Sequence, residues 1–181
     1  QKAINLLKEI SDKDLRDVSL VVLKDNLDNS VKGKGEIYNA YILNPRVSNE
    51  MLRPYKKELA SYFNREQTKK FRDNPQELIN WVKDSINVND ELNARNIPMD
   101  SRSVLKHRIT DSRSRNIFFV SMARSLGIAS RIDPVTGKVQ YIKGNDWIDV
   151  KFEENAVEAV PTQQGTLMAK YVPSGALTDL R

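Results

Sequence analysis

The residues able to perform nucleophilic or metal chemistry are few in this chain. Among its 181 residues there is no cysteine, and His107 is the single histidine. The sequence therefore excludes a thiol nucleophile, a zinc–thiolate site and a disulfide framework. Ser112 and His107 form the one pair that could suggest a serine hydrolase, because a serine hydroxyl needs a base to take its proton. Since no nucleophile elbow surrounds Ser112, we interpret it as a first-turn helix residue and His107 as part of a basic loop.

Acidic residues give no stronger indication of a metal site. Asp133, Asp146 and Asp149 could suggest calcium, but their spacing matches no EF-hand loop. Turn aspartates are the simpler interpretation, because an aspartate side chain accepts hydrogen bonds from the backbone of its own turn. We therefore expect neither a metal nor any other cofactor.

Positive charge is spread along the chain rather than concentrated. The 29 basic residues are interspersed with 24 acidic ones, which gives a net charge of +5 and a pI near 9.3. A dedicated nucleic-acid binder usually clusters its charge, so this pattern disfavours nucleic acid as a partner. One basic cluster could bind an anion at a helix N-terminus, but a solvated face paired with Asp111 explains it better. This cluster comprises Lys106, His107, Arg108, Arg113 and Arg115.

Length and composition fit one soluble domain with one core. The hydrophobic fraction is 39%, and no apolar run approaches the roughly 18 residues that a membrane helix needs. The sequence starts at Gln1 without an initiator methionine or a signal-like stretch. We therefore expect it to be a piece of a longer chain whose targeting segment is not included.

The first half of the chain shows helical periodicity. An N-cap at Asn74, a proline at the first helical position and a capping-box glutamate, Glu77, predict the start of one helix. An irregular polar stretch should follow over residues 87–100. The apolar residues that mark the helices are Ala3, Ile4, Leu6, Leu7 and Ile10; Leu15, Val18, Val22 and Leu23 after a cap at Ser11; the stretch 37–43; Met51, Leu52, Tyr55, Leu59 and Tyr62; and Leu78, Ile79, Val82 and Ile86.

The second half combines one apolar helix with short strands. A helix from Ser112 to Leu126 is apolar over more than half of its circumference, which predicts that it is buried between other elements. Asp111 is its expected N-cap, and Gly127 with Ile128 predicts a Schellman motif at its end. Strands are predicted at residues 129–132, 139–142 and 147–152, with a last strand expected at 165–172. Helices followed by an antiparallel sheet indicate an α+β fold.

The segment from Phe118 to Arg131 carries a resemblance to a known family. Its sequence, FFVSMARSLGIASR, closes with the pattern Arg-x-Leu-Gly-Ile-x-x-Arg. It resembles the central helix and following strand of transglutaminase-like domains, a branch of the papain-like cysteine-protease fold. The resemblance is best from about Leu78 to Phe152 and is strengthened by Trp147. It implies a buried central helix packed on an antiparallel sheet, with the N-terminal residues as a helical extension.

The resemblance does not carry over the Cys–His–Asp triad of that family. The cysteine position falls on Ser112, the histidine position on Asn145 and the acid position near Val160. An amide cannot act as a base near neutral pH, and losing triad members costs on the order of 10⁶ in turnover in a serine protease. We therefore expect a degenerate site in which Ser112 faces Asn145 across a cleft, with Trp147 packed on the buried helix. The alternative acid positions are Asp149, Glu153 and Glu154.

We predict a helical extension at residues 1–72, a transglutaminase-like core at 73–162, and a terminal strand or the start of a following domain at 163–181. The resemblance implies a catalytically inactive binding or structural module of a larger extracytoplasmic bacterial protein, because the family often occurs in multidomain secreted bacterial chains. Its partners would be a peptide or glycan and other domains of the same chain. The ligand-binding candidates are Ser112, Arg113, Asn145 and Trp147.

Two alternatives come from other functional classes. An active hydrolase or peptidase of the same superfamily would need a relocated base beside Ser112. A nucleic-acid-binding module is the second alternative, since some DNA-repair damage sensors reuse a triad-less transglutaminase-like domain. It would need a contiguous positive face.

Overall fold

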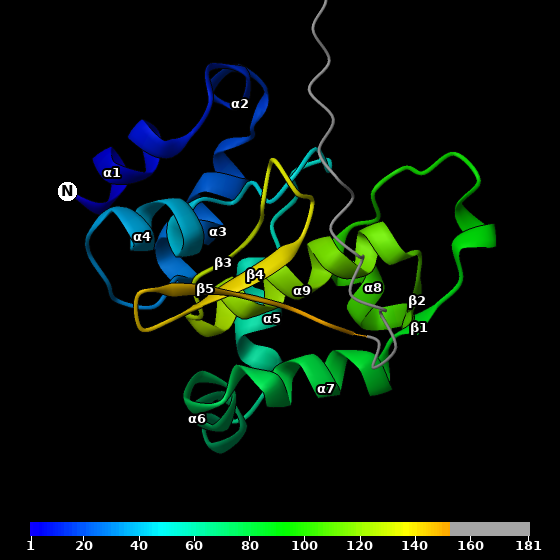
Figure 1. The fold of residues 1–181 in the computed structure, drawn as a ribbon. Coiled ribbons are helices and arrows are strands. Elements are labelled where there is room, and N and C mark those ends of the chain that lie inside the picture. Colours follow the sequence, from blue (N-terminus) through cyan, green and yellow to red (C-terminus); the bar gives the residue numbers. More distant parts are fainter. Residues whose placement is uncertain (153–181) are drawn as a thin grey trace, which may run out of the picture.

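The computed structural model describes residues 1–152, and a long helix, α9, runs through the centre of that part (Figure 1). The helical elements are α1 (Lys2–Glu9), α2 (Asp12–Asp17), α3 (Leu20–Asn29), α4 (Glu36–Tyr38), the π-helix η1 (Asn39–Leu43), α5 (Lys56–Tyr62), α6 (Arg65–Asp73), α7 (Pro75–Ser85), the 3₁₀-helix η2 (Asp90–Asn93), α8 (Ser101–His107) and α9 (Ser112–Leu126). The strands are β1 (Asn87–Val88), β2 (Ile109–Thr110), β3 (Ser130–Ile132), β4 (Val139–Lys143) and β5 (Asp146–Asp149).

Helix α9 is buried, as its sequence predicts. Every residue from Ile117 to Leu126 is buried, and Phe118 and Phe119 are fully inaccessible. Helices α5, α6, α7 and α8 and strand β3 all contact it. Because apolar side chains project from most of its circumference, only such an enclosed position removes them from water.

Both ends of α9 form the caps that the sequence predicts. At the start, the Asp111 carboxylate accepts a hydrogen bond from the N–H of the third helical residue at 2.9 Å. At the end, the N–H groups of Gly127 and Ile128 donate to the carbonyls of Arg124 and Ala123, the two bonds of a Schellman motif. Gly127 has a φ of 86°, in the left-handed region that favours glycine.

Three antiparallel strands form a meander against α9, in the order β3-β4-β5. Ser130 of β3 pairs with Tyr141 of β4. Val139 and Tyr141 face α9 and share its hydrophobic cluster. Asp133 accepts hydrogen bonds from two backbone N–H groups of the β3–β4 turn, which confirms its assignment as a turn aspartate. The three predicted strands are thus confirmed, with small shifts at their ends.

Three features of the fold have no counterpart in the sequence prediction. Helix α6 buries only Phe71, so it shows no apolar stripe. Helix α8 lies where we expected a basic loop, and it ends at His107. Strands β1 and β2 form a two-residue parallel pair that joins Asn87 to Ile109. Such a pairing between distant segments leaves no local pattern in the sequence.

Local signals mislead at two helix ends. The predicted second helix is two helices, α2 and α3, because the backbone at Val18 and at Ser19 is extended. Helix α7 begins at its proline as predicted, but the Asn74 side chain makes no cap hydrogen bond. Glu77, the expected capping-box partner, lies 3.2 Å from the Lys70 ammonium instead. A complete capping box occurs at the start of α6.

Helix α5 begins later than its apolar pattern predicts. The sequence favours a helix from Met51, whereas the structure has it from Lys56. Pro54 disfavours helical backbone at the residue before it. The Asp25 carboxylate of α3 then caps α5, accepting hydrogen bonds from the N–H groups of Lys56 and Lys57 at 2.7 and 3.1 Å. A long-range cap therefore decides the boundary.

Two hydrophobic clusters connect the N-terminal helices with α9 and the segment that follows it. Leu59 of α5 and Phe71 of α6 belong to the same cluster as α9, and a second cluster joins α1 and η1 to Ala129. The buried Arg124 guanidinium of α9 links the two regions, since it donates to the carbonyls of Asn44 at 3.0 Å and Arg46 at 2.7 Å. The predicted domain boundary at residue 72 lies inside α6.

The structure confirms the α+β class, with helices first and a small antiparallel sheet after them. Within residues 1–152, no helix combines the length and the apolar character that crossing a membrane requires. The strand expected at 165–172 and the segment 163–181 lie outside the described residues.

Candidate functional site

The first turn of α9 contains Ser112, the predicted nucleophile position. The Asp90 carboxylate of η2 accepts two hydrogen bonds from it, 2.6 Å from the backbone nitrogen and 2.8 Å from Oγ. These bonds, that of the backbone N–H first, lower the pKa of Asp90. Asp90 is therefore ionised at neutral pH and caps this helix end beside Asp111.

This contact makes Ser112 a poor nucleophile. A carboxylate with a lowered pKa is a weak base for removing a hydroxyl proton. The Ser112 N–H, which could otherwise stabilise a developing oxyanion, is already bound to Asp90. His107 lies in the last turn of α8, and no hydrogen bond joins it to Ser112 within residues 1–152. Within residues 1–152, the hydrogen bonds of Ser112 thus give it no activating base, and its own N–H is already occupied.

Asn145 lies at the opposite end of α9 from Ser112. Just before it along the chain, the Ile142 N–H donates to the carbonyl of Ala129, which lies two residues beyond the C-terminal cap of α9. Strand β5 then runs back along the helix, and Phe152 after it packs on the N-terminal half of α9 (Figure 1). An extended chain from Asn145 to Phe152 covers roughly 20 Å. The expectation that Ser112 faces Asn145 across a cleft is therefore not met.

Trp147 packs on the outer side of the sheet rather than on α9. Its ring packs edge-on against that of Tyr41 in η1, with 4.8 Å between the two ring centroids. The Arg131 guanidinium lies 4.2 Å from the centroid of the Trp147 ring. The expected packing on the buried helix is wrong because side chains alternate along a strand. Tyr141 faces α9, and Trp147 pairs with the next residue, Ile142.

The predicted basic cluster is divided among separate contacts. The Arg108 guanidinium lies over the rings of Trp81 and Tyr62, at 4.9 and 5.3 Å. The Arg115 guanidinium lies 4.3 Å from the Phe152 ring. The expected pairing of these cations with Asp111 is not present, because Asp111 accepts from Asn93 and from the first turn of α9.

Arg113 bridges two loops at the start of α9. Its Nη1 donates to the Asn96 carbonyl at 3.1 Å, and its Nη2 donates to the Asn49 side chain. Asn49 belongs to the loop between η1 and α5, and Asn96 to the loop between η2 and α8. Of the four ligand-binding candidates, the structure thus brings Ser112 and Arg113 together and places Asn145 and Trp147 elsewhere.

Of the remaining acidic candidates, Asp149 is engaged in the sheet. Asp149 of β5 binds the side chains of Lys138 at 2.6 Å and Gln140 at 2.8 Å, so it is a strand residue rather than a turn residue. In the described part of the chain, no group of three His, Cys, Asp or Glu side chains is placed to hold a metal. Val160, Glu153 and Glu154 lie outside that part.

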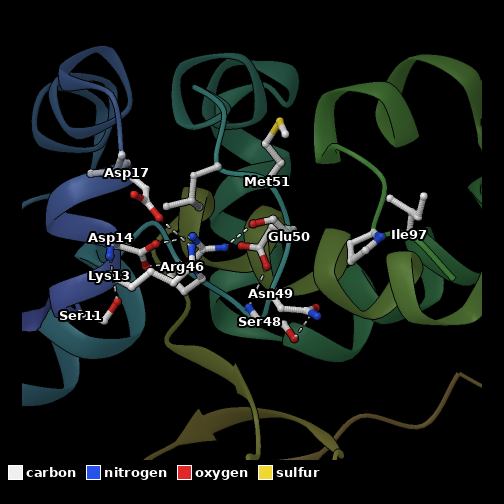
Figure 2. Close-up of a pocket in the computed structure, with 13 residues that line it drawn as sticks. Ser11, Lys13, Asp14, Asp17, Arg46, Ser48, Asn49, Glu50, Met51 and Ile97 are labelled. Atoms are coloured by element: carbon white, nitrogen blue, oxygen red, sulfur yellow. Dashed lines mark hydrogen bonds and ion pairs between the residues drawn. The ribbon is translucent and has the colours of Figure 1, made fainter.

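A cavity of about 660 Å³ opens beside the Arg113 bridge, between α2, the η1–α5 loop and the loop before α8 (Figure 2). The N-terminal end of α9 holds one wall, because the Met99 N–H donates to Ser114 Oγ at 2.9 Å. Neither Ser112, Asn145 nor Trp147 lines it. Its lining residues are Ser11, Lys13, Asp14, Asp17, Val18, Arg46, Ser48, Asn49, Glu50, Met51, Leu52, Ile97 and Pro98.

A charged network fixes the η1–α5 loop to α2 at this cavity. The Arg46 guanidinium makes two hydrogen bonds to the Asp14 carboxylate, one of them from Nε at 2.9 Å. A third goes to the Glu50 backbone carbonyl, and the Glu50 carboxylate accepts from the N–H groups of Val47 and Ser48 at 3.0 and 2.8 Å. The hydrogen bond from Arg46 lowers the pKa of Asp14. Cavity shape thus depends on ionic contacts.

Sequence reasoning does not find this cavity. Asp14 and Arg46 are separated by 32 positions and belong to no motif. The sequence assigns Met51 to an apolar helical pattern and leaves Ile97 in the irregular polar stretch 87–100. Neither pattern indicates that the two residues line the same space.

Comparison with known proteins identifies a family. The model of the transglutaminase-like superfamily matches residues 57–158, which is more than half of the chain. The matched span begins in α5 and includes α9 and the three-stranded sheet. No curated protein and no solved structure matches the chain.

Proposed function

Because this chain belongs to the transglutaminase-like superfamily but contains no cysteine, we propose that it is a catalytically inactive member that acts as a binding module. The observation that carries this proposal is the pair of hydrogen bonds from Ser112 to Asp90. A family member without the thiol would need another activated nucleophile at the start of α9. Ser112, the residue found there, instead donates the hydrogen bonds through which Asp90 caps the start of α9.

The hydrolase alternative draws no support from the same contacts. Activating Ser112 would require a base within hydrogen-bond reach and a free donor for the oxyanion. The Asp90 carboxylate already accepts the hydrogen bond of the Ser112 N–H, and its negative charge lies where an oxyanion would add a second one. A turnover enzyme built on Ser112 would first have to release Asp90.

The nucleic-acid alternative is disfavoured by how the cations are used. Arg108 lies over aromatic rings, and Arg113 bridges Asn49 and Asn96. Their guanidinium groups are committed to the protein rather than aligned as a phosphate-binding stripe. We therefore rank this function below ligand binding.

The binding site that we propose is the cavity between α2 and the start of α9, with Arg113 at its border. Its volume of about 660 Å³ falls in the range of small-molecule and short-ligand sites. Its lining mixes apolar side chains with a few fixed polar groups, the combination that binding sites use. It takes the place of the cleft expected around Ser112, Asn145 and Trp147.

The setting in a larger extracytoplasmic bacterial protein, with other domains of the same chain as partners, rests on the family resemblance alone. Cell fractionation of the native full-length protein tests it. Recovery in the cytoplasmic fraction would contradict the proposed location.

The proposed lack of catalysis is tested with a glutamine-containing acyl-donor peptide and a fluorescent primary amine, at neutral pH. We expect hydrolysis and amine incorporation to equal those of the buffer blank. Ser112→Ala serves as the matched variant and should give the same result, with circular dichroism confirming that it is folded. Turnover that disappears in Ser112→Ala would overturn the proposal in favour of the hydrolase.

A further inference from the structure

We propose that the cavity between α2 and the start of α9 binds an extended peptide segment that carries an aliphatic side chain next to a basic one. This inference rests on the proposed binding function and names its ligand class. Three features carry it: two apolar walls, an unpaired backbone segment and an excess of carboxylates.

The most exposed apolar residues of the lining come from two different loops. Met51 of the η1–α5 loop is 72% exposed and Ile97 of the loop before α8 is 61% exposed, and both line the cavity (Figure 2). Val18, Leu52 and Pro98 add to the same lining. Single exposed apolar residues are common, but a group around one hollow indicates a place for an apolar ligand group. The flexible methionine can adapt to different aliphatic side chains.

The backbone beside Met51 is free to pair with a peptide. The residues from Met51 to Arg53 lie in neither helix nor strand. In the part of the chain that the structure describes, their N–H and C=O groups make no hydrogen bond within the protein. The flanks are fixed, because Arg46 holds the Glu50 carbonyl and Asp25 caps α5. An extended peptide can align with such an anchored segment through main-chain hydrogen bonds.

The charge of the lining favours a basic ligand. Three carboxylates, those of Asp14, Asp17 and Glu50, line the cavity against the two cations of Lys13 and Arg46. This local excess of negative charge contrasts with the net charge of +5 of the whole chain. The Asp17 side chain is 61% exposed, and its one ion pair within residues 1–152 is an exposed contact of 3.2 Å with Lys13 in α2. It can therefore meet a cation of the ligand.

A peptide fits the lining better than a glycan does. Sugar rings are commonly held on flat aromatic faces, and none of the described residues that line this cavity is aromatic. The aromatic pair Tyr41 and Trp147 lies on the sheet, toward the other end of α9. A glycan is therefore the competing ligand class that the experiment must separate.

The test is a methyl NMR titration that follows Met51 and Ile97. The probe is a capped pentapeptide with leucine at its centre and lysine on each side. Its controls have glutamate flanks or a central serine, and a β-1,4-linked tetrasaccharide represents glycans. We expect saturable shifts of both methyl signals with the leucine–lysine probe, and weaker or no shifts with the others.

Variants then assign the contacts. Ile97→Ser should raise the dissociation constant of the leucine–lysine probe about tenfold or more. Asp17→Asn should raise it about twofold to fivefold. Val135→Ser, at a residue that is 90% exposed in the β3–β4 turn, should leave the affinity unchanged.

Three results would overturn the inference. Equal binding of the glutamate-flanked probe would exclude the charge preference. Shifts caused only by the tetrasaccharide would exclude the peptide class while retaining the cavity as a binding site. No shift with any probe would reject the ligand assignment. The proposed lack of catalysis is judged separately, by the acyl-donor assay.

Discussion

The two ends of α9 differ in how they are stabilised. Residues 117–126 are buried without exception, whereas the first turn is half-buried at Ser112 and Arg113. The buried part is held by apolar packing and by hydrogen bonds from the Arg124 guanidinium to backbone carbonyls. The first turn is held by polar side chains of separate segments, Asp90 of η2 and Asn49 of the η1–α5 loop.

This difference places the residues that matter most for stability and the proposed binding site at different parts of one helix. A close-packed interior resists change in volume, so the buried part can vary little. Polar contacts made by loops tolerate substitution better and can be rearranged for a ligand. The cavity accordingly adjoins the first turn and not the buried part. Changes in the buried part should therefore have the larger effect on stability.

The largest effect should come from Phe119→Ala. Phe119 is fully inaccessible and meets Phe152 edge-on at 5.6 Å. Removing its ring leaves a cavity that α9 and the sheet cannot fill, so the free energy of unfolding should fall by about 3–5 kcal/mol. Urea denaturation followed by circular dichroism measures it. Val135→Ala, in an exposed turn, is the control and should stay within about 0.5 kcal/mol. A loss below 1 kcal/mol at Phe119 would contradict a packed centre.

Arg124→Met should have the next largest effect. Its guanidinium donates to the carbonyls of Ser130 at 2.9 Å, Asn44 at 3.0 Å and Arg46 at 2.7 Å. Methionine keeps much of the volume but leaves these carbonyls without their donor, so we expect a loss of about 2–3 kcal/mol. The same urea titration applies, with the exposed Arg65→Met as the matched control. Equal stability of the two variants would show that Arg124 does not join the N-terminal helices to the core.

Sequence reasoning succeeds where the cause is local. The ends of α9 follow from Asp111 and Gly127, because each cap needs only neighbouring residues. Its burial follows from the number of apolar positions around its circumference. The strands of the meander follow from alternation and turn residues. In all three cases the information lies within a short window of the chain.

Sequence reasoning fails where contacts between distant segments determine a helix boundary or the place of a residue. Helix α5 begins where Asp25 caps it, and no local pattern reports that contact. The resemblance implies that Asn145 faces Ser112, yet the direction of the meander along α9 puts Asn145 at the other end. The cavity depends on Asp14 and Arg46, which meet only in the fold. The lack of a thiol nucleophile could be read from the sequence, but the cavity that we propose as a binding site could not.

Asp14→Asn tests the polar region with a smaller, pH-dependent effect. Hydrogen bonding to Arg46 lowers the pKa of Asp14, so its carboxylate stabilises the fold above the unfolded-state pKa of about 3.9. That contribution is lost as pH falls through the lower folded-state value. We expect the variant to be about 1–2 kcal/mol less stable at pH 7, with the difference shrinking below about pH 4.

Urea denaturation of both proteins across pH 3–7 measures this difference. Asp12→Asn, at an exposed neighbour in the same helix, is the matched control and should change stability less. A difference between Asp14→Asn and the parent protein that stays constant over the whole pH range would contradict an ionic origin.

The smallest effect concerns reactivity at the first turn of α9, probed by Ser112→Cys. Because the chain has no cysteine, the introduced thiol is the sole one and can be followed by its alkylation rate. A helix N-terminus alone would lower the thiol pKa, but the Asp90 carboxylate binds this turn and disfavours a second anion. The thiol should therefore stay largely protonated at pH 7.

Adding Asp90→Asn should raise its alkylation rate at pH 7 about threefold or more by lowering the thiol pKa. Measuring rate against pH in both variants separates that pKa shift from a change in access, which would alter the limiting rate at high pH instead. If Ser112→Cys alone already reacts as a thiolate at pH 7, Asp90 does not control this helix end. If the expected order holds, restoring the missing thiol does not by itself restore an activated nucleophile.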